Sequence, residues 1–142
     1  MRRHLASRYL LPEPRNALAE AVRRHASAAM DVSDGLAGDL GKLCRASGVG
    51  AEIEVARVPL SKAARTALAA EPKVVETVLT GGDDFEVVAT IPPAALEVFL
   101  AAARVARVPV TAIGQVTAGK ASRFLDLDGR PLRFARASFS HF

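Results

Sequence analysis

Residues 28–48, AAMDVSDGLAGDLGKLCRASG, contain the pattern on which the fold of this chain depends. The apolar run from Ala28 to Val32 is typical of a short strand, and it leads into small and acidic residues. After Asp34-Gly35, apolar residues recur at helical spacing until Gly48. These are Leu36, Leu40, Leu43 and Cys44. The stretch therefore predicts a strand, a tight turn and an amphipathic helix.

Upstream of this unit, Pro12 and Pro14 indicate a loop, and we interpret residues 1–15 as a connector. The Ala- and Arg-rich run from Asn16 to about His25 predicts a helix with Asn16 as its cap. We expect residues 16–142 to form a single α/β domain.

Strands and helices continue to alternate downstream. Residues 51–58 predict a strand, Ser61 is expected to cap a helix that runs to Ala70, and residues 74–79 favour a helix over a strand. The nearly continuous apolar run of residues 85–91 is typical of a strand covered on both faces. The next helix face is formed by Leu96, Phe99, Leu100 and Ala103.

The remaining part of the chain predicts three more strands, at 110–116, 122–127 and 132–134, the last two joined as a hairpin by Asp128-Gly129. Strands that alternate with helices and end in a hairpin indicate an α/β (α+β) fold, with helices packed on a mixed β-sheet.

Composition indicates an ordinary soluble domain. Half of the 142 residues are hydrophobic, and no apolar run reaches the length of a membrane span. Cys44 is the single cysteine, which excludes an internal disulfide and favours the reducing cytoplasm. The net charge of +4 favours anionic ligands, but none of the usual nucleic-acid-binding motifs occurs, so we expect neither a nucleic acid nor a membrane as a partner.

Two carboxylates and a hydroxyl, from Asp31, Ser33 and Asp34, lie where the first strand meets its helix. Carboxylates at such a junction can bind Mg²⁺, a hard cation that is usually held by one or two carboxylates together with substrate phosphates. The alternative is that Ser33 or Asp34 only caps the helix.

A second polar cluster, residues 80–86 (TGGDDFE), precedes the long apolar strand. Paired glycines allow the backbone to approach a ligand closely, and the adjacent acids could bind donors or a cation, although an ordinary turn would have the same composition. Neither a Walker A loop nor a dinucleotide-binding glycine motif is present.

Taken in order, the residue 31–36 motif, the Gly-Gly-acid-Asp-aromatic-Glu run at 81–86 and the closing residues 139–142 resemble the landmarks of the thiamine-monophosphate kinase family. The resemblance extends over essentially the whole chain, with supporting similarity at residues 44–51 and 113–116. It implies the carboxy-terminal α/β domain of the fold that is shared with aminoimidazole ribonucleotide synthetase, preceded in the full enzyme by an ATP-binding half that forms a homodimer.

The resemblance also implies an activity, the ATP-dependent phosphorylation of thiamine monophosphate to thiamine diphosphate, with this chain inactive without the amino-terminal half. It implies that Asp31 and Asp34 contact Mg²⁺, that Ser33 contacts ATP phosphates, and that Asp83 and Phe139 border the thiamine phosphate. Asp83 departs from the family pattern, in which Glu is usual. The alternative function is a non-catalytic ligand-binding or interaction domain of the same superfamily.

Overall fold

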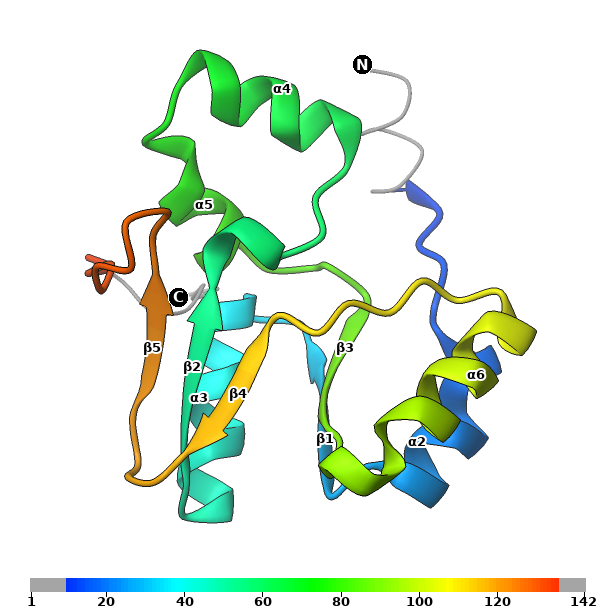
Figure 1. Ribbon diagram of the computed structural model, residues 1–142. Coiled ribbons are helices and arrows are strands. Elements are labelled where there is room, and N and C mark those ends of the chain that lie inside the picture. Colours follow the sequence, from blue (N-terminus) through cyan, green and yellow to red (C-terminus); the bar gives the residue numbers. More distant parts are fainter. Residues whose placement is uncertain (1–9, 136–142) are drawn as a thin grey trace.

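The computed structural model describes residues 10–135, and its first strand pair determines where the polar loops lie (Figure 1). Strand β1 (Ala28–Val32) pairs antiparallel with β3 (Glu86–Thr90), in a register that places Val32 opposite Glu86. The end of β1 and the beginning of β3 therefore lie together. The loop that follows β1 and the loop that precedes β3 are neighbours, although they are far apart in the sequence.

A second sheet has β2 (Gly50–Glu54) as its middle strand. Strand β4 (Gly114–Thr117) pairs antiparallel with one edge of β2, and β5 (Ser122–Leu125) pairs parallel with the other. This sheet is mixed, as the sequence predicts. The strands are divided between two sheets, however, rather than joined in one.

Helix α3 (Leu36–Ser47) holds the two sheets together. Its apolar face contacts β1, β2 and β5, and in Figure 1 the helix lies behind the mixed sheet. The helix ends at Gly48, which adopts a left-handed conformation with φ 68°. The buried core around α3 consists of Val32, Ala37, Leu40, Leu43, Cys44, Ala51, Ile53, Leu79, Val88 and Phe124. The predicted strand, turn and helix at residues 28–48 are confirmed.

The remaining helices lie on either side of this core. Helix α2 (Ala19–His25), which follows the 3₁₀ turn η1 (Asn16–Leu18), packs against α6 (Leu96–Ala106), which follows the 3₁₀ turn η3 (Pro93–Ala95). Leu18, Phe99 and Ala103 form a small separate core between them.

The 3₁₀ turn η2 (Val55–Arg57) follows β2 and leads towards α4 (Lys62–Ala70) and α5 (Val74–Thr80). The predicted cap of α4 is confirmed, since the Ser61 hydroxyl accepts a hydrogen bond from the Ala64 amide at 3.1 Å. Asn16 was a wrong prediction as a cap, because the turn that it begins has no side-chain capping bond.

The long apolar strand was expected to be covered on both faces, and this prediction is wrong. Among residues 10–135, strand β3 pairs only with β1, and Val87, whose side chain is 48% exposed, lies on a face that no described residue covers. A continuous apolar run is typical of a strand that is buried on both faces. Within the described part of the chain, the two-stranded sheet that contains β3 packs on one face only, although residues 85–91 form a nearly continuous apolar run.

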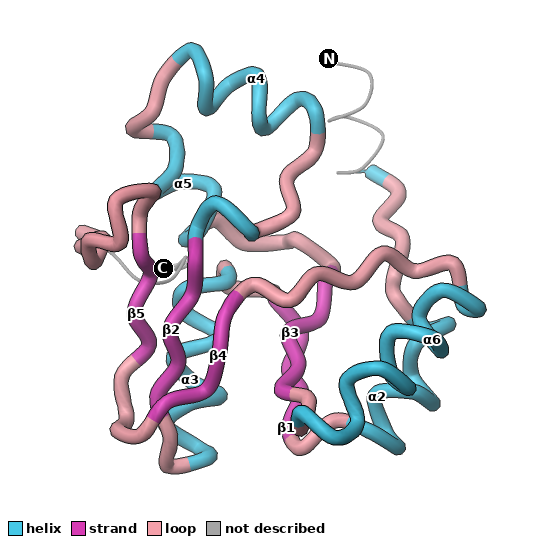
Figure 2. Tube along the Cα trace, viewed as in Figure 1, coloured by secondary structure: helices cyan, strands magenta, loops and turns pink. Residues whose placement is uncertain are grey.

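The last predicted strands are shorter than expected. Figure 2 shows residues 107–113 as a loop that leads into β4, so the predicted strand at 110–116 begins only at Gly114. The turn at Asp128-Gly129 forms, with the Asp126 amide donating to the Arg130 carbonyl at 2.9 Å. Its second strand is reduced to an isolated bridge between Leu125 and Pro131, because proline has no amide hydrogen for the ladder. No helix among residues 10–135 is long and apolar enough to cross a membrane.

Candidate functional site

Two polar loops meet at one end of the β1–β3 pair. The Asp83 amide donates a hydrogen bond to the Ser33 carbonyl at 2.9 Å, which joins the loop after β1 to the loop before β3. The backbone of Gly35 lies directly against Thr80 and Gly81, because a Cβ on Gly35 would be 2.6 Å from the Thr80 carbonyl carbon. The two clusters that the sequence singles out separately are thus one site.

A buried carboxylate, which the sequence analysis missed, holds the first loop in shape. The Asp39 side chain is 0% exposed, and its Oδ2 accepts hydrogen bonds from the amides of Ser33 at 2.9 Å and Asp34 at 2.8 Å. Its Oδ1 accepts from Lys42 Nζ at 2.8 Å. Burial by itself raises the pKa of Asp39, but the bonds from Lys42 and the two amides outweigh it and leave the pKa lowered. Asp39 is therefore ionised and fully paired.

Lys42 connects this buried acid to a predicted metal ligand. Its Nζ also donates to Asp34 Oδ2 at 2.5 Å, and the bonds to Asp34 and then to Asp39 raise the pKa of the lysine. The alternative in which Ser33 or Asp34 caps the helix is wrong: the cap position is Gly35, and no side chain bonds there. Asp34 is half-buried and its second oxygen makes no bond to a described residue.

The other predicted residues lie on the open side of the same loops. Asp31 is exposed on β1, opposite Val87 of β3, and Ser33 and Asp83 are also exposed. Both backbone groups of Ser33 are occupied, its amide by Asp39 and its carbonyl by Asp83, which leaves the hydroxyl for a ligand. Phe139 lies outside the described residues.

The loop before β3 has an unusual backbone. Asp83 and Phe85 have positive φ values of 64° and 52°, and Phe85 is 47% exposed. Positive φ is unfavourable for residues other than glycine, and for an aromatic residue especially, so surrounding contacts must hold this conformation. Such backbone strain is concentrated at functional sites, which favours the ligand-binding interpretation over an ordinary turn.

An arginine that precedes the first helix is also attached to the site. Arg15 Nε donates to Glu86 Oε2 at 2.9 Å and Nη2 donates to Oε1 at 2.5 Å, a bidentate pair. Glu86 begins β3, so Arg15 joins the end of the predicted 1–15 connector to the acidic loop. Neither residue was assigned a role from the sequence, because they are 71 positions apart.

Negative charge accumulates in this loop. Although Asp84 as a residue is exposed, the pKa of its carboxyl is raised to about 6, first by burial of the carboxyl and then by repulsion from Glu86, Asp83 and Asp39. A cation bound here would relieve that repulsion. Among residues 10–135, no three His, Cys, Asp or Glu side chains are arranged as a metal site.

The raised pKa of Asp84 leads to a pH prediction. The folded-state pKa of about 6 exceeds the unfolded reference of 3.8, so ionisation destabilises the folded chain as pH rises through this range. Below about pH 4 the cost is absent. We expect Asp84→Asn to raise the free energy of unfolding by about 1 kcal/mol at pH 8, since solvent screens an exposed group, and to leave it unchanged at pH 3.5. Urea unfolding with a chelator present measures both values, and an equal gain at both pH values would contradict this electrostatic origin.

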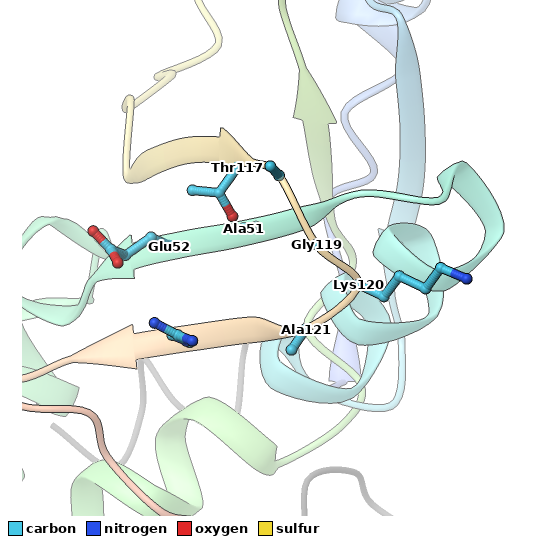
Figure 3. A pocket seen from close by; sticks show the side chains of 8 residues that line it. Ala51, Glu52, Thr117, Gly119, Lys120 and Ala121 are labelled. Atoms are coloured by element: carbon cyan, nitrogen blue, oxygen red, sulfur yellow. The ribbon is translucent and has the colours of Figure 1, made fainter.

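Two cavities of the described part of the chain lie elsewhere. One, of about 230 Å³, lies beside β2, β4 and β5 and has Lys120 among its lining residues (Figure 3). A second, of about 250 Å³, is lined mainly by apolar residues of α3 and of strand ends. None of the predicted site residues lines either one. Asp31, Ser33 and Asp83 of the candidate site are exposed.

The fold and these loops define a class: an α+β domain that presents an acidic, strained loop pair at the end of two strands. The chain belongs to the family described as AIR synthase related protein, C-terminal domain, which matches residues 3–126. The expected fold is confirmed.

Individual relatives that match most of this chain are thiamine-monophosphate kinases. That of Caulobacter vibrioides is 41% identical over 116 residues, a match that covers 80% of this chain and 33% of the relative. The crystal structure of the enzyme from Stenotrophomonas maltophilia has a TM-score of 0.80 at 33% identity, covering 91% of this chain and 40% of that one. AaThiL, solved in complex with AMPPCP and TMP, has a TM-score of 0.77 at 29% identity, covering 98% of this chain and 41% of that one. This chain thus spans roughly two-fifths or less of these relatives, and the resemblance to the kinase family is confirmed.

Proposed function

We propose that this chain is the carboxy-terminal part of a thiamine-monophosphate kinase, and that its acidic loop pair contributes to a shared site for Mg²⁺, ATP and thiamine monophosphate. The observation that carries the proposal is the hydrogen bond between the Asp83 amide and the Ser33 carbonyl, because it unites the two motifs of the kinase resemblance. The AaThiL complex with AMPPCP, an ATP analogue, and TMP supports this choice of ligands.

In this proposal each residue has a separate role. Asp31 and the second oxygen of Asp34 face the cation, while Lys42 keeps the other Asp34 oxygen in place. The Ser33 hydroxyl donates to ATP phosphates, and Asp83 and Phe139 border the thiamine phosphate. Bound Mg²⁺ would neutralise charge on the transferred γ-phosphoryl group.

The reaction transfers the ATP γ-phosphoryl group to a phosphate oxygen of thiamine monophosphate, which gives ADP and thiamine diphosphate. Such a transfer needs positioning and charge neutralisation rather than a covalent protein intermediate. The buried Asp39 supports the positioning, because it fixes the amides of Ser33 and Asp34 with two bonds each shorter than 3 Å. These contacts set the direction in which the two side chains leave the backbone.

The test is coupled ATP turnover with thiamine monophosphate and Mg²⁺, for this chain alone and mixed with an amino-terminal half prepared separately from the same organism. We expect turnover only in the mixture, reduced on the order of 100-fold by Asp31→Asn or Asp34→Asn, since a cation stabilises the transition state by several kcal/mol. Asp128→Asn is a matched control, because Asp128 is an exposed acid of the β5 turn.

A mixture of folded, associated halves without turnover would contradict the kinase proposal and favour the non-catalytic binding domain. Turnover that survives both Asp31→Asn and Asp34→Asn would leave the activity standing and overturn the assignment of these two residues. Circular dichroism of each variant separates loss of activity from loss of fold, and little loss of fold is expected because Asp34 and Lys42 are each about a third exposed.

A further inference from the structure

Helix α6 has apolar residues on two opposite faces. One face carries Phe99 and Ala103, which are buried against η1 and α2. With 100° of rotation per residue, Val98, Ala101 and Val105 lie together on the opposite face. There Val98 is 56% exposed and Val105 is 85% exposed, so no described residue covers this face. A helix with apolar residues on two opposite faces normally has both of them covered.

Two opposite charges border the exposed apolar stripe. Glu97 and Arg104 are seven residues apart, so both project from the same flank of Val98, Ala101 and Val105. Neither makes an ion pair with any residue in the range 10–135. On the neighbouring helix α2, by contrast, Glu20 pairs with both Arg23 and Arg24. The arrangement on α6 leaves an acid at one end of the stripe and a base at the other.

This pattern is complementary to itself. When two copies of α6 lie antiparallel about a two-fold axis, Val98 of each packs near Ala101 of the other, and Glu97 of each faces Arg104 of the other. The small Ala101 at the middle of the stripe lets the two helices approach closely. A parallel arrangement would instead place the charged flanks of the two copies on opposite sides of the seam, where Glu97 and Arg104 form no ion pairs, so the charges also favour the antiparallel orientation.

We propose that the exposed face of α6, formed by Val98, Ala101 and Val105 and bordered by Glu97 and Arg104, is a self-association surface for a second copy of this chain. In Figure 1, α6 lies at the edge of the fold, away from the polar loops after β1 and before β3. The interface is therefore independent of the proposed catalytic site.

The expected dimer is weak. Helix α6 has 11 residues, which gives a seam of about three turns, below the size of standard stable interfaces. Burial of two valines and one alanine on each copy supplies the attraction, and the two symmetric ion pairs on the rim supply orientation more than affinity. We expect a monomer at low micromolar concentration and a dimer as the concentration approaches millimolar.

Sedimentation equilibrium from low micromolar to nearly millimolar concentration tests whether the chain associates. The Val105→Glu variant tests whether the association uses the exposed face of α6. Because Val105 is so exposed, the substitution should leave thermal unfolding nearly unchanged and weaken dimerisation at least about 10-fold, since it puts a charge into the apolar seam. Glu71→Arg, at an exposed acid beyond α4, is a control for a change in net charge. A wild-type chain that stays monomeric throughout, or a dimer that Val105→Glu leaves intact, would overturn the proposal.

Charge exchange tests the orientation. Glu97→Arg and Arg104→Glu should each weaken the dimer, because each places like charges on both sides of the seam. The double variant restores both ion pairs and should dimerise as the wild type does. A mixture of the two single variants should form a heterodimer more readily than either alone forms a homodimer. Equal effects of the single and double variants would rule out the antiparallel pairing.

Discussion

Replacing Asp39 by Ala is expected to lower the free energy of unfolding by about 3–5 kcal/mol, a large part of the total stability of a domain of this size. The carboxylate is fully buried and accepts bonds from two loop amides and from Lys42. Its removal leaves the amides of Ser33 and Asp34 without acceptors and leaves a cavity under α3. Each unsatisfied buried group costs about 1–3 kcal/mol.

Urea unfolding followed by circular dichroism measures this loss at neutral pH. The lowered pKa of Asp39 means that its stabilisation is present above the unfolded pKa and disappears as pH falls through the folded one. The difference between wild type and Asp39→Ala should therefore shrink in acid. Glu71→Ala is the matched control for an exposed acid and should change stability by less than about 0.5 kcal/mol. A loss below about 1 kcal/mol for Asp39→Ala would show that solvent or another side chain replaces the carboxylate.

Local sequence signals predicted those elements whose causes are local. The strand at residues 28–32 was predicted with its observed bounds, and Ser61 was predicted as a cap that the structure contains, because both depend on residues within a few positions. The exposed face of β3 was not predictable in this way. A continuous apolar run indicates hydrophobicity, whereas the number of strands and helices that cover it is decided by the rest of the chain.

The residues of the candidate site likewise divide into those that local sequence signals predict and one that depends on the fold. Asp31, Ser33, Asp34 and Asp83 could be selected from the sequence because acids and hydroxyls gather beside glycines at strand ends. Asp39 was not predicted as a site residue, because an acid in the first turn of a helix normally faces solvent. Its burial follows from the path of the preceding loop, whose amides turn back to meet it. The signal that could have indicated the buried acid is its place among the apolar positions of the predicted helix, with a lysine three residues later.

Gly35→Ala is expected to have an effect of similar size, about 4 kcal/mol or more, because of backbone strain and steric overlap together. Gly35 has φ 99° and ψ 145°, a conformation that is accessible almost only to glycine and costs other residues on the order of 1–3 kcal/mol. A Cβ there would also lie 2.6 Å from the Thr80 carbonyl carbon and 2.7 Å from the Gly81 oxygen. Both neighbours are backbone atoms, so a change of side-chain rotamer cannot relieve the overlap, and the loops must separate.

Substitutions at two other glycines distinguish the cost of backbone strain from the cost of steric overlap. Gly48 also has positive φ, but a Cβ added to it would meet no atom within 4 Å, so Gly48→Ala should cost only about 1 kcal/mol. Gly41, inside α3, has ordinary helical geometry and its nearest neighbour is the flexible end of Arg45 at 3.4 Å, so Gly41→Ala should be nearly neutral or stabilising. If Gly35→Ala costs no more than Gly48→Ala, the close approach of the two loops is not maintained in solution. If it costs much more, and hydrogen exchange at the Asp83 amide accelerates relative to the α3 amides, then the contact at Gly35 is what keeps the two polar loops together as one site.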